Sequence, residues 1–262
     1  MAETTHLTKQ QQRLLKLVYK FRFITAPLLS KLLSIRHDTA FNALQSLYKL
    51  ELLERRYEQS WRIDRRPAYY YLSKKGVTTV KKLLELKDGG VNSLYHDAKA
   101  SPEFIQGCFN NLACYIAIKQ DLPAETSIRT KTEINRFKIF PKTRPDLYVK
   151  TSDGQEAFII ITPDKLPYFV NKRRDEYLEH SEDEGWNGKY PVIAFVLKDT
   201  RSKLGFLYKA HEKLEEMGFE QNDVSIVATD INQLLSEGNP GWASVYNPTK
   251  YIAKFPLKMR QS

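Results

Sequence analysis

The chain has 262 residues, of which 42% are hydrophobic and 12% aromatic, enough to build the cores of two modest domains. No apolar run approaches the roughly 20 residues that span a bilayer, and the first ten residues lack the apolar stretch of a signal peptide. We therefore expect a folded protein of the cytoplasm with no membrane partner.

The formal net charge of +10 is unevenly distributed along the chain. Residues 1–88 contain 18 Lys and Arg against 8 Asp and Glu, whereas residues 89–262 contain 23 of each kind. The whole excess lies in the first third, which points to an acidic partner for that part of the chain.

The first predicted element is a helix within residues 7–23. Thr8 is placed to cap it, and Leu14, Leu17, Val18 and Phe21 fall on one face at helical spacing. This helix is expected to pack behind the elements that follow.

Residues 24–76 predict a winged helix-turn-helix. Thr25 is the expected N-cap of a helix over 26–33, a turn covers 34–36, and a second helix covers 37–50. The stretches LLERRYE and AYYYLS then predict two strands with a wing between them.

The second helix is amphipathic, because Ala40, Leu44, Leu47 and Leu50 recur at spacings of four and three. Its opposite face is polar and begins beside Arg36, at the end that enters the major groove in helix-turn-helix proteins. Asn42 and Gln45 suit bidentate contact with adenine, and Arg36 suits guanine. The DNA-contacting residues predicted here are Arg36, His37, Thr39, Asn42, Gln45 and Lys49.

The predicted wing contributes five further candidates, grouped around Trp61. Guanidinium groups at this density suit phosphates or a narrow minor groove. They are Arg55, Arg56, Arg62, Arg65 and Arg66. The alternative is that these arginines are only solvated and the module binds proteins.

After the wing, a helix is expected over 77–87 following Gly76, and the sequence KDGGVNS then places a domain boundary at 88–93. The expected domains are 1–88 and 94–262. A largely buried helix should cover 102–119, with Cys108 and Cys114 as core residues, since they match no metal-binding or disulfide pattern.

The second domain carries four candidate strands, in DLYVKT, EAFIIIT, PVIAFVL and VSIVAT, with helices near 168–181 and 202–217. Two of the strands are continuously apolar, as in central strands covered on both faces. The chain is thus expected to be α+β, with the winged helix followed by an α/β domain around a mixed sheet.

The series LTKQQQRLLKLVYKFRFITAPLLSKLL, LQSLYKLELLERR, YYYLSKKG, His96, TRPDLYVK and VLKDTRSKLGFL resembles the replication-relaxation family of plasmids and other mobile elements, over about residues 7–215. The resemblance implies a winged-helix DNA-binding domain, a second domain similar to PD-(D/E)xK nucleases, and a role in plasmid replication or its control.

A nuclease of that kind needs an acid at the start of one strand and an acid-x-Lys on the next, to hold Mg²⁺ and orient water. Asp146 matches the first position, Glu133 is a candidate additional acid, and Lys165 is the nearest lysine. The second motif fails, because Pro163 stands two residues before Lys165. We therefore expect a catalytically degenerate domain with no metal and no cofactor.

The sequence contains no P-loop, GxGxxG, GxSxG or HExxH motif. The abundance of tyrosine leaves a relaxase-type tyrosine nucleophile as an alternative. The favoured hypothesis is a sequence-specific protein that binds double-stranded DNA as a homodimer and controls transcription or replication, with the second domain used for dimerisation or partner contact. The alternatives are a Mg²⁺-dependent endonuclease using Glu133, Asp146 and Lys165, and a protein-interaction adaptor.

Overall fold

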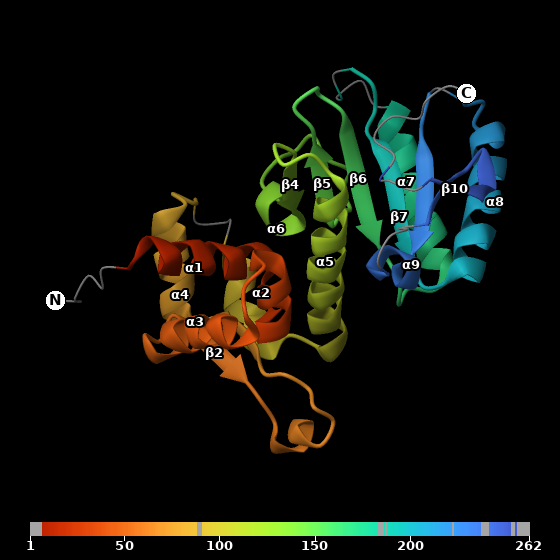
Figure 1. Ribbon diagram of the computed structural model, residues 1–262. Helices are drawn as coiled ribbons and strands as arrows, with labels where there is room; N and C mark the ends of the chain where they lie inside the picture. The colour runs from red at the N-terminus through yellow and green to blue at the C-terminus, as the bar shows by residue number, and fades with distance from the viewer. Residues whose placement is uncertain are drawn as a thin grey trace. The chain divides into compact units, whose positions relative to one another are not determined.

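The computed structural model describes residues 7–87, 91–182, 186, 188–221, 223–236, 241–252 and 255. The chain divides into two compact units, residues 1–112 and 113–262, each with its own sheet (Figure 1). Within the described ranges, no helix combines the length and apolarity that a membrane crossing needs.

Unit 1 combines helices with a small three-stranded sheet. Its elements are α1 (Lys9–Phe21), β1 (Ile24–Thr25), α2 (Ala26–Leu33), α3 (His37–Lys49), β2 (Leu53–Arg56), the 3-10 turn η1 (Gln59–Arg62), β3 (Tyr69–Leu72), α4 (Lys74–Leu83), the 3-10 segment η3 (Asn92–Lys99) and the first half of α5 (Pro102–Asp121).

The helix starts follow from local capping, as the sequence predicts. Thr8 and Gln11 form a reciprocal capping box at α1, with the Gln11 amide nitrogen 3.2 Å from the Thr8 hydroxyl. Thr25 caps α2 through the amide of Leu28 at 3.4 Å. Ser34 then takes a left-handed conformation that ends α2, and α3 begins three residues later. The predicted helix-turn-helix is confirmed.

The small sheet has the order β1-β3-β2, with both pairs antiparallel. Strand β1 is two residues long and was not expected from the sequence, because Thr25 serves both as a strand residue and as the cap of α2. Tyr70 of β3 pairs with Ile24 on one side and with Arg55 on the other. The sheet thus ties the base of the wing to the entry of α2.

Helix α4 begins earlier than the sequence predicts, and Gly76 lies inside it rather than before it. Ser73 caps the helix by accepting a hydrogen bond from the Gly76 amide at 3.0 Å. A Cβ at position 76 would overlap the backbone carbonyl oxygen of Leu52. Glycine is therefore required here by close approach of two backbones, not as a helix stop.

We expect Gly76→Ala to destabilise the protein by about 1–3 kcal/mol, because the added methyl group meets a backbone that cannot rotate away. Helix propensity alone predicts the opposite sign, a gain of roughly 1 kcal/mol. Urea unfolding measures the difference. Gly107→Ala is the matched control, since Gly107 lies within a helix with open space around its Cβ position. Equal effects at both positions would refute the close-approach explanation.

The division between the units falls within α5, further along than the boundary expected at 88–93, of which residues 88–90 lie outside the described part. The reason is packing within unit 1. Arg22 forms an ion pair with the buried carboxylate of Asp97 and donates to the Ser93 carbonyl at 2.8 Å. Phe23 packs with Ile105 and Cys108. Cys108 and Cys114 are both buried, so the prediction of core cysteines is confirmed.

Unit 2 is an α/β arrangement with a seven-stranded sheet, in the order β10-β9-β8-β7-β6-β5-β4. Strands β6, β7 and β8 run parallel, and the remaining pairs are antiparallel, which confirms the predicted mixed sheet. Its elements are β4 (Ser127–Thr130), α6 (Lys131–Ile134), β5 (Leu147–Lys150), β6 (Glu156–Ile161), α7 (Pro167–Glu182), β7 (Val192–Leu197), α8 (Thr200–Glu216), β8 (Ile226–Asp230), α9 (Ile231–Leu235), β9 (Trp242–Ser244) and β10 (Asn247–Ile252).

The central strands of unit 2 are buried on both faces. Phe158 and Phe195 belong to a core shared with Leu178 of α7 and Leu207 of α8. On β6, Ile159 points to the opposite face from Phe158 and is also fully buried. The continuous apolar runs in the sequence therefore correspond to central strands, as predicted.

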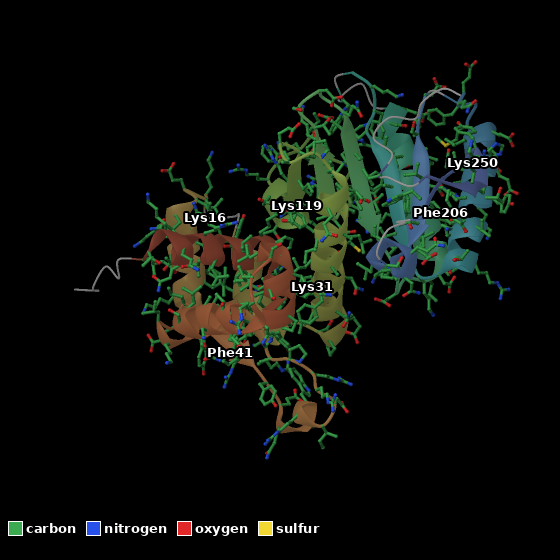
Figure 2. The ribbon with its side chains drawn as sticks, viewed as in Figure 1. Lys16, Lys31, Phe41, Lys119, Phe206 and Lys250 are labelled. Carbon is green, nitrogen blue, oxygen red and sulfur yellow. The ribbon has the colours of Figure 1, made fainter. Side chains whose placement is uncertain are left out.

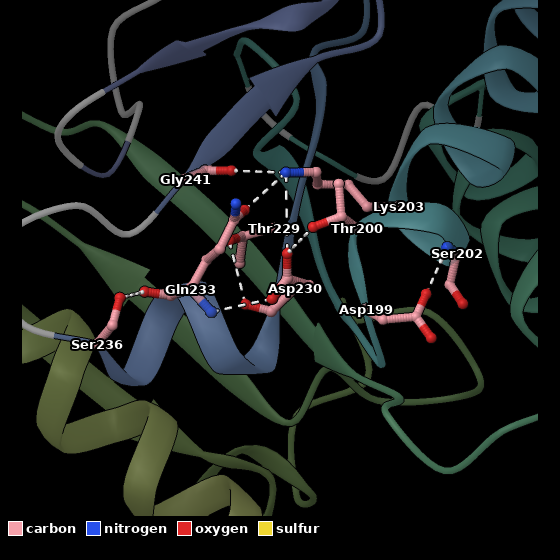
Figure 3. Close-up of polar contacts among 9 residues, drawn as sticks. All are labelled: Asp199, Thr200, Ser202, Lys203, Thr229, Asp230, Gln233, Ser236 and Gly241. Carbon is pink, nitrogen blue, oxygen red and sulfur yellow. Dashed lines mark hydrogen bonds and ion pairs between the residues drawn. The ribbon is translucent and has the colours of Figure 1, made fainter.

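A polar cluster holds α8, β8 and α9 together inside unit 2 (Figure 3). Lys203 is fully buried, and its Nζ donates to Gln233 Oε1 at 2.7 Å and to the Gly241 carbonyl at 3.4 Å. Asp230 lies 4.0 Å away, and its carboxylate also accepts from the Thr200 hydroxyl at 2.9 Å. No local pattern in the sequence predicts this buried ion pair, because Lys203 and Asp230 lie far apart along the chain.

Candidate nucleic-acid interface

Helix α3 has one face in the core of unit 1 and one in solvent. Ala40, Leu44 and Leu47 are fully buried. The predicted contact residues Arg36, His37, Thr39, Asn42 and Lys49 are all exposed. Arg36 precedes the first turn in an extended conformation and makes no capping bond with its side chain. The N-terminal turns of α3 therefore present an amide, a hydroxyl and a guanidinium to solvent.

Gln45 differs from the other predicted contacts on α3, because the fold gives its side chain a partner inside unit 1. Its side chain is half-buried, and Nε2 donates a hydrogen bond to the hydroxyl of Tyr70 at 2.8 Å. Burial raises the pKa of Tyr70, while Arg55 and Gln45 act in the opposite direction. Gln45 thus joins α3 to strand β3, because the core offers it a partner that the helical pattern does not reveal.

The wing comprises residues 55–68, which are the end of β2 and the loop that follows it, containing η1. Trp61 is half-buried and stacks on Tyr69, with ring centroids 5.5 Å apart. Backbone bonds close the loop on itself, from Trp61 to the Glu58 carbonyl and from Arg66 to the Trp61 carbonyl, each at 2.9 Å. The indole therefore anchors the wing to the sheet and holds the arginines around it.

The five wing arginines are all exposed, but they have different surroundings. Arg55 stacks over the ring of Tyr48 at 5.2 Å, Arg56 pairs with Glu58 at 3.4 Å, and Arg66 pairs with Asp64 at 3.3 Å. Arg62 and Arg65 form no ion pair with any residue that the structure describes. These two guanidinium groups are the ones left for a partner.

Sequence reasoning missed four exposed apolar or aromatic side chains on α3 and the wing, which are Phe41, Tyr48, Tyr57 and Ile63. Phe41 projects from the ribbon of α3 (Figure 2). Ile63 is 86% exposed, between Arg62 and Arg65 in the wing. The sequence signal for Ile63 was an isolated isoleucine within an arginine-rich turn. A single apolar residue in such a turn cannot be part of a core, so its exposure could have been predicted.

The residues of the nuclease hypothesis have other partners in unit 2. Asp146 is buried, and its Oδ2 accepts a hydrogen bond from the Ile161 amide at 2.8 Å and lies 3.3 Å from Nη1 of Arg173. Glu133 accepts from the Thr130 amide at 2.8 Å as the capping-box residue of α6. Lys165 is exposed in the loop after β6.

These contacts engage the Asp146 carboxylate within unit 2. Burial lowers the pKa of Arg173 and the Asp146 carboxylate raises it, and the rise prevails. On the next strand, the residue that contacts Asp146 is Ile161, which has no carboxylate to serve as the second acid. Among the described residues, no three His, Cys, Asp or Glu side chains gather in a way that would hold a metal ion.

The succession α1, β1, α2, α3, β2, wing, β3 defines unit 1 as a winged helix-turn-helix, which a second α/β unit follows. Residues 15–180 match the replication-relaxation family, and the chain belongs to that family. The match begins within α1 and ends within α7.

No curated protein matches the chain. Among solved structures, a variant of ZitR from Lactococcus lactis in complex with DNA is similar at 21% identity, with 44% of this chain and 76% of that chain covered and a TM-score of 0.27. The adhesin competence repressor AdcR from Streptococcus pyogenes is similar at 21% identity, with 44% and 83% covered and a TM-score of 0.26. Because these TM-scores are low, a DNA-binding function has to be argued from the geometry of unit 1.

Proposed function

We propose that this protein binds double-stranded DNA sequence-specifically through unit 1, and controls replication or transcription of a mobile element in the cytoplasm. The observation that carries the proposal is the exposed polar start of α3, in a unit whose wing holds two unpaired arginines among the described residues. The positive charge excess of residues 1–88 supports it, since duplex DNA is the acidic partner that a winged helix suits.

In the proposed complex, the N-terminal turns of α3 enter the major groove. Asn42 contacts an adenine edge, Arg36 a guanine edge, and Phe41 suits a thymine methyl group. The wing lies along the backbone, with Arg62 and Arg65 on phosphates or in the adjacent minor groove. Ile63, which is exposed between them, suits apolar contact within that groove.

The test is binding of the purified full chain to fragments of its own upstream DNA at several salt concentrations. Half of the samples contain Mg²⁺, and the DNA is run on a denaturing gel afterwards. Retention of one fragment in preference to others, with the DNA intact, is the expected result. Binding that is absent or insensitive to salt would favour a protein-interaction adaptor. Metal-dependent cuts that Asp146→Ala abolishes would establish the endonuclease instead.

We expect Asn42→Ala to reduce discrimination between the preferred fragment and a mutated one by about 1–3 kcal/mol, because one bidentate base contact is lost. Gln45→Ala is the comparison, since it removes the bond to Tyr70 and should instead lower stability by about 1 kcal/mol. Competition binding and urea unfolding of both variants separate the two roles. Loss of discrimination in the Gln45 variant alone would reverse the assignment.

Unit 2 is proposed to serve dimerisation or partner contact without hydrolysing DNA. Asp146 stands at the start of β5 and is hydrogen-bonded to the end of β6, which supports the resemblance to PD-(D/E)xK nucleases, but its carboxylate is engaged by Arg173. A homodimer is proposed because one winged helix reads a short site. Light scattering that finds a monomer both free and on DNA would contradict it.

A further inference from the structure

A pocket of about 620 Å³ opens in unit 2 at the carboxyl ends of the parallel strands β6 and β7. The loop after β6 and the first turns of α7 and α8 surround it. Its apolar lining includes Val170, Leu197 and Phe206, all of which are buried. Phe206 belongs to α8 (Figure 2). The floor of the pocket is thus hydrophobic and is part of the buried core of unit 2.

The rim of this pocket carries more cations than anions. Lys165, Lys198, Arg201 and Lys209 line it, and none of them forms an ion pair with a described residue. The acids on the rim are Asp164 and Asp199. Asp199 is engaged as the cap of α8, accepting a hydrogen bond from the Ser202 amide at 2.7 Å, and this bond lowers its pKa. The charge left for a partner is positive.

Three large apolar side chains lie exposed on the same loop and helix start. Leu166 is 67% exposed, Tyr168 69% and Phe169 55%. Leu166 also lines the pocket, and the rings of Tyr168 and Phe169 contact edge to face at 5.4 Å. Exposed apolar side chains of this size, beside a pocket, are typical of a surface that binds another molecule.

We propose that this surface, formed by residues 162–170 and 197–209 and called the α7–α8 pocket, binds a protein segment that carries an apolar side chain flanked by Asp or Glu. The apolar side chain fills the pocket, and the carboxylates pair with Lys198 and Arg201 on its rim. The inference rests on the proposed partner role of unit 2 and names the chemistry of that partner.

The positive rim suits any acidic partner, and the exposed apolar side chains favour an acidic protein segment over nucleic acid. A phosphate backbone would use the four cations but would leave Leu166, Tyr168 and Phe169 exposed to water. An acidic segment with an apolar anchor uses both features, because its side chain enters the hydrophobic floor while its charges meet the rim.

The test begins with selection of a random twelve-residue peptide library, displayed on phage, against the full chain. The most enriched peptide is then synthesised with a fluorescent label, and its affinity is measured by anisotropy. Two variants test the site. Gly205→Phe is designed to fill the pocket with a bulky side chain. Gly205 lines the pocket, and a Cβ added there would have no atom beyond the adjacent helix backbone within 4 Å. Lys198→Glu with Arg201→Glu reverses the rim charge.

We expect enriched peptides to place an aromatic or aliphatic residue between acidic ones, and each variant to weaken binding by about tenfold or more. Lys138→Glu with Lys189→Glu is the control, since both are exposed lysines of unit 2 that do not line the pocket. Peptides without that composition, or binding that Gly205→Phe leaves unchanged, would overturn the proposal.

A variant with Arg62→Ala and Arg65→Ala separates this proposal from DNA binding by unit 1. We expect it to keep the peptide affinity while its affinity for DNA falls by about 60-fold at 0.1 M salt. If a duplex of random sequence displaces the peptide from this variant, the α7–α8 pocket is a nucleic-acid site and the peptide proposal fails. If the parent protein binds peptide but no DNA, the peptide proposal stands and the DNA-binding function falls.

Discussion

Replacing Arg62 and Arg65 together by alanine is expected to weaken binding to every DNA duplex alike, by about 60-fold at 0.1 M salt. The slope of log affinity against log salt concentration should fall by about 2, because each phosphate contact releases roughly 0.9 counterion. Preference for the cognate fragment should be unchanged, since backbone contacts carry no base information. A salt series on cognate and random fragments measures all three quantities.

The expectation rests on the different surroundings of the wing arginines. Arg56 and Arg66 already have carboxylate partners within 3.4 Å, whereas Arg62 and Arg65 have none among the described residues. Lys138→Ala with Lys189→Ala removes the same charge from exposed positions of unit 2 and serves as the control. An equal loss in the control would mean that net charge, and not the wing, sets the affinity. A parental salt slope in the wing variant would rule out the proposed docking.

Lys203→Met is expected to destabilise unit 2 by about 3–5 kcal/mol, the largest stability effect that the structure predicts. The change leaves Asp230 buried without the cation beside it, and it removes a hydrogen bond of 2.7 Å to Gln233. The contact of the Lys203 ammonium with the Tyr251 ring, at 4.4 Å, is lost as well. Calorimetry should show a fall in Tm of about 6 °C or more for a unit of this size.

Two further variants check the cause of that loss. Lys213 lies on the same helix as Lys203 and forms an exposed ion pair with Glu216. Lys213→Met removes this pair and should lower the free energy of unfolding by about 1 kcal/mol or less. Adding Asp230→Asn to Lys203→Met should restore part of the stability, because the buried charge disappears while a polar side chain remains at the start of α9. If Lys203→Met costs no more than Lys213→Met, the buried ion pair is not stabilising.

Local patterns in the sequence were sufficient for much of the fold. Caps such as Thr8 and Thr25 act on residues within the same turn, so the starts of α1 and α2 could be read directly. Continuous apolar runs likewise predicted the central strands of unit 2. Gly76 was misread, because its requirement comes from Leu52, a residue distant in sequence.

The same distinction applies to the candidate sites. Periodicity placed Asn42 and Gln45 together on the outer face of α3, and only the fold of unit 1 brought Tyr70 close enough to hold Gln45 inward. The sequence alone shows that the acid-x-Lys motif is incomplete. It does not show that Asp146 pairs with Arg173 of α7, because the two residues are brought together only by the fold.

The sequence by itself determined the winged helix-turn-helix, its charge and the mixed sheet of the second unit, because helix caps, hydrophobic period and composition are short-range properties of the chain. The tertiary structure alone decided which polar groups remain for a partner. The exposure of Ile63, the burial of Lys203 and the shape of the α7–α8 pocket all depend on contacts between residues far apart in sequence. Whether a side chain is exposed or engaged is settled by such packing and not by its neighbours along the chain.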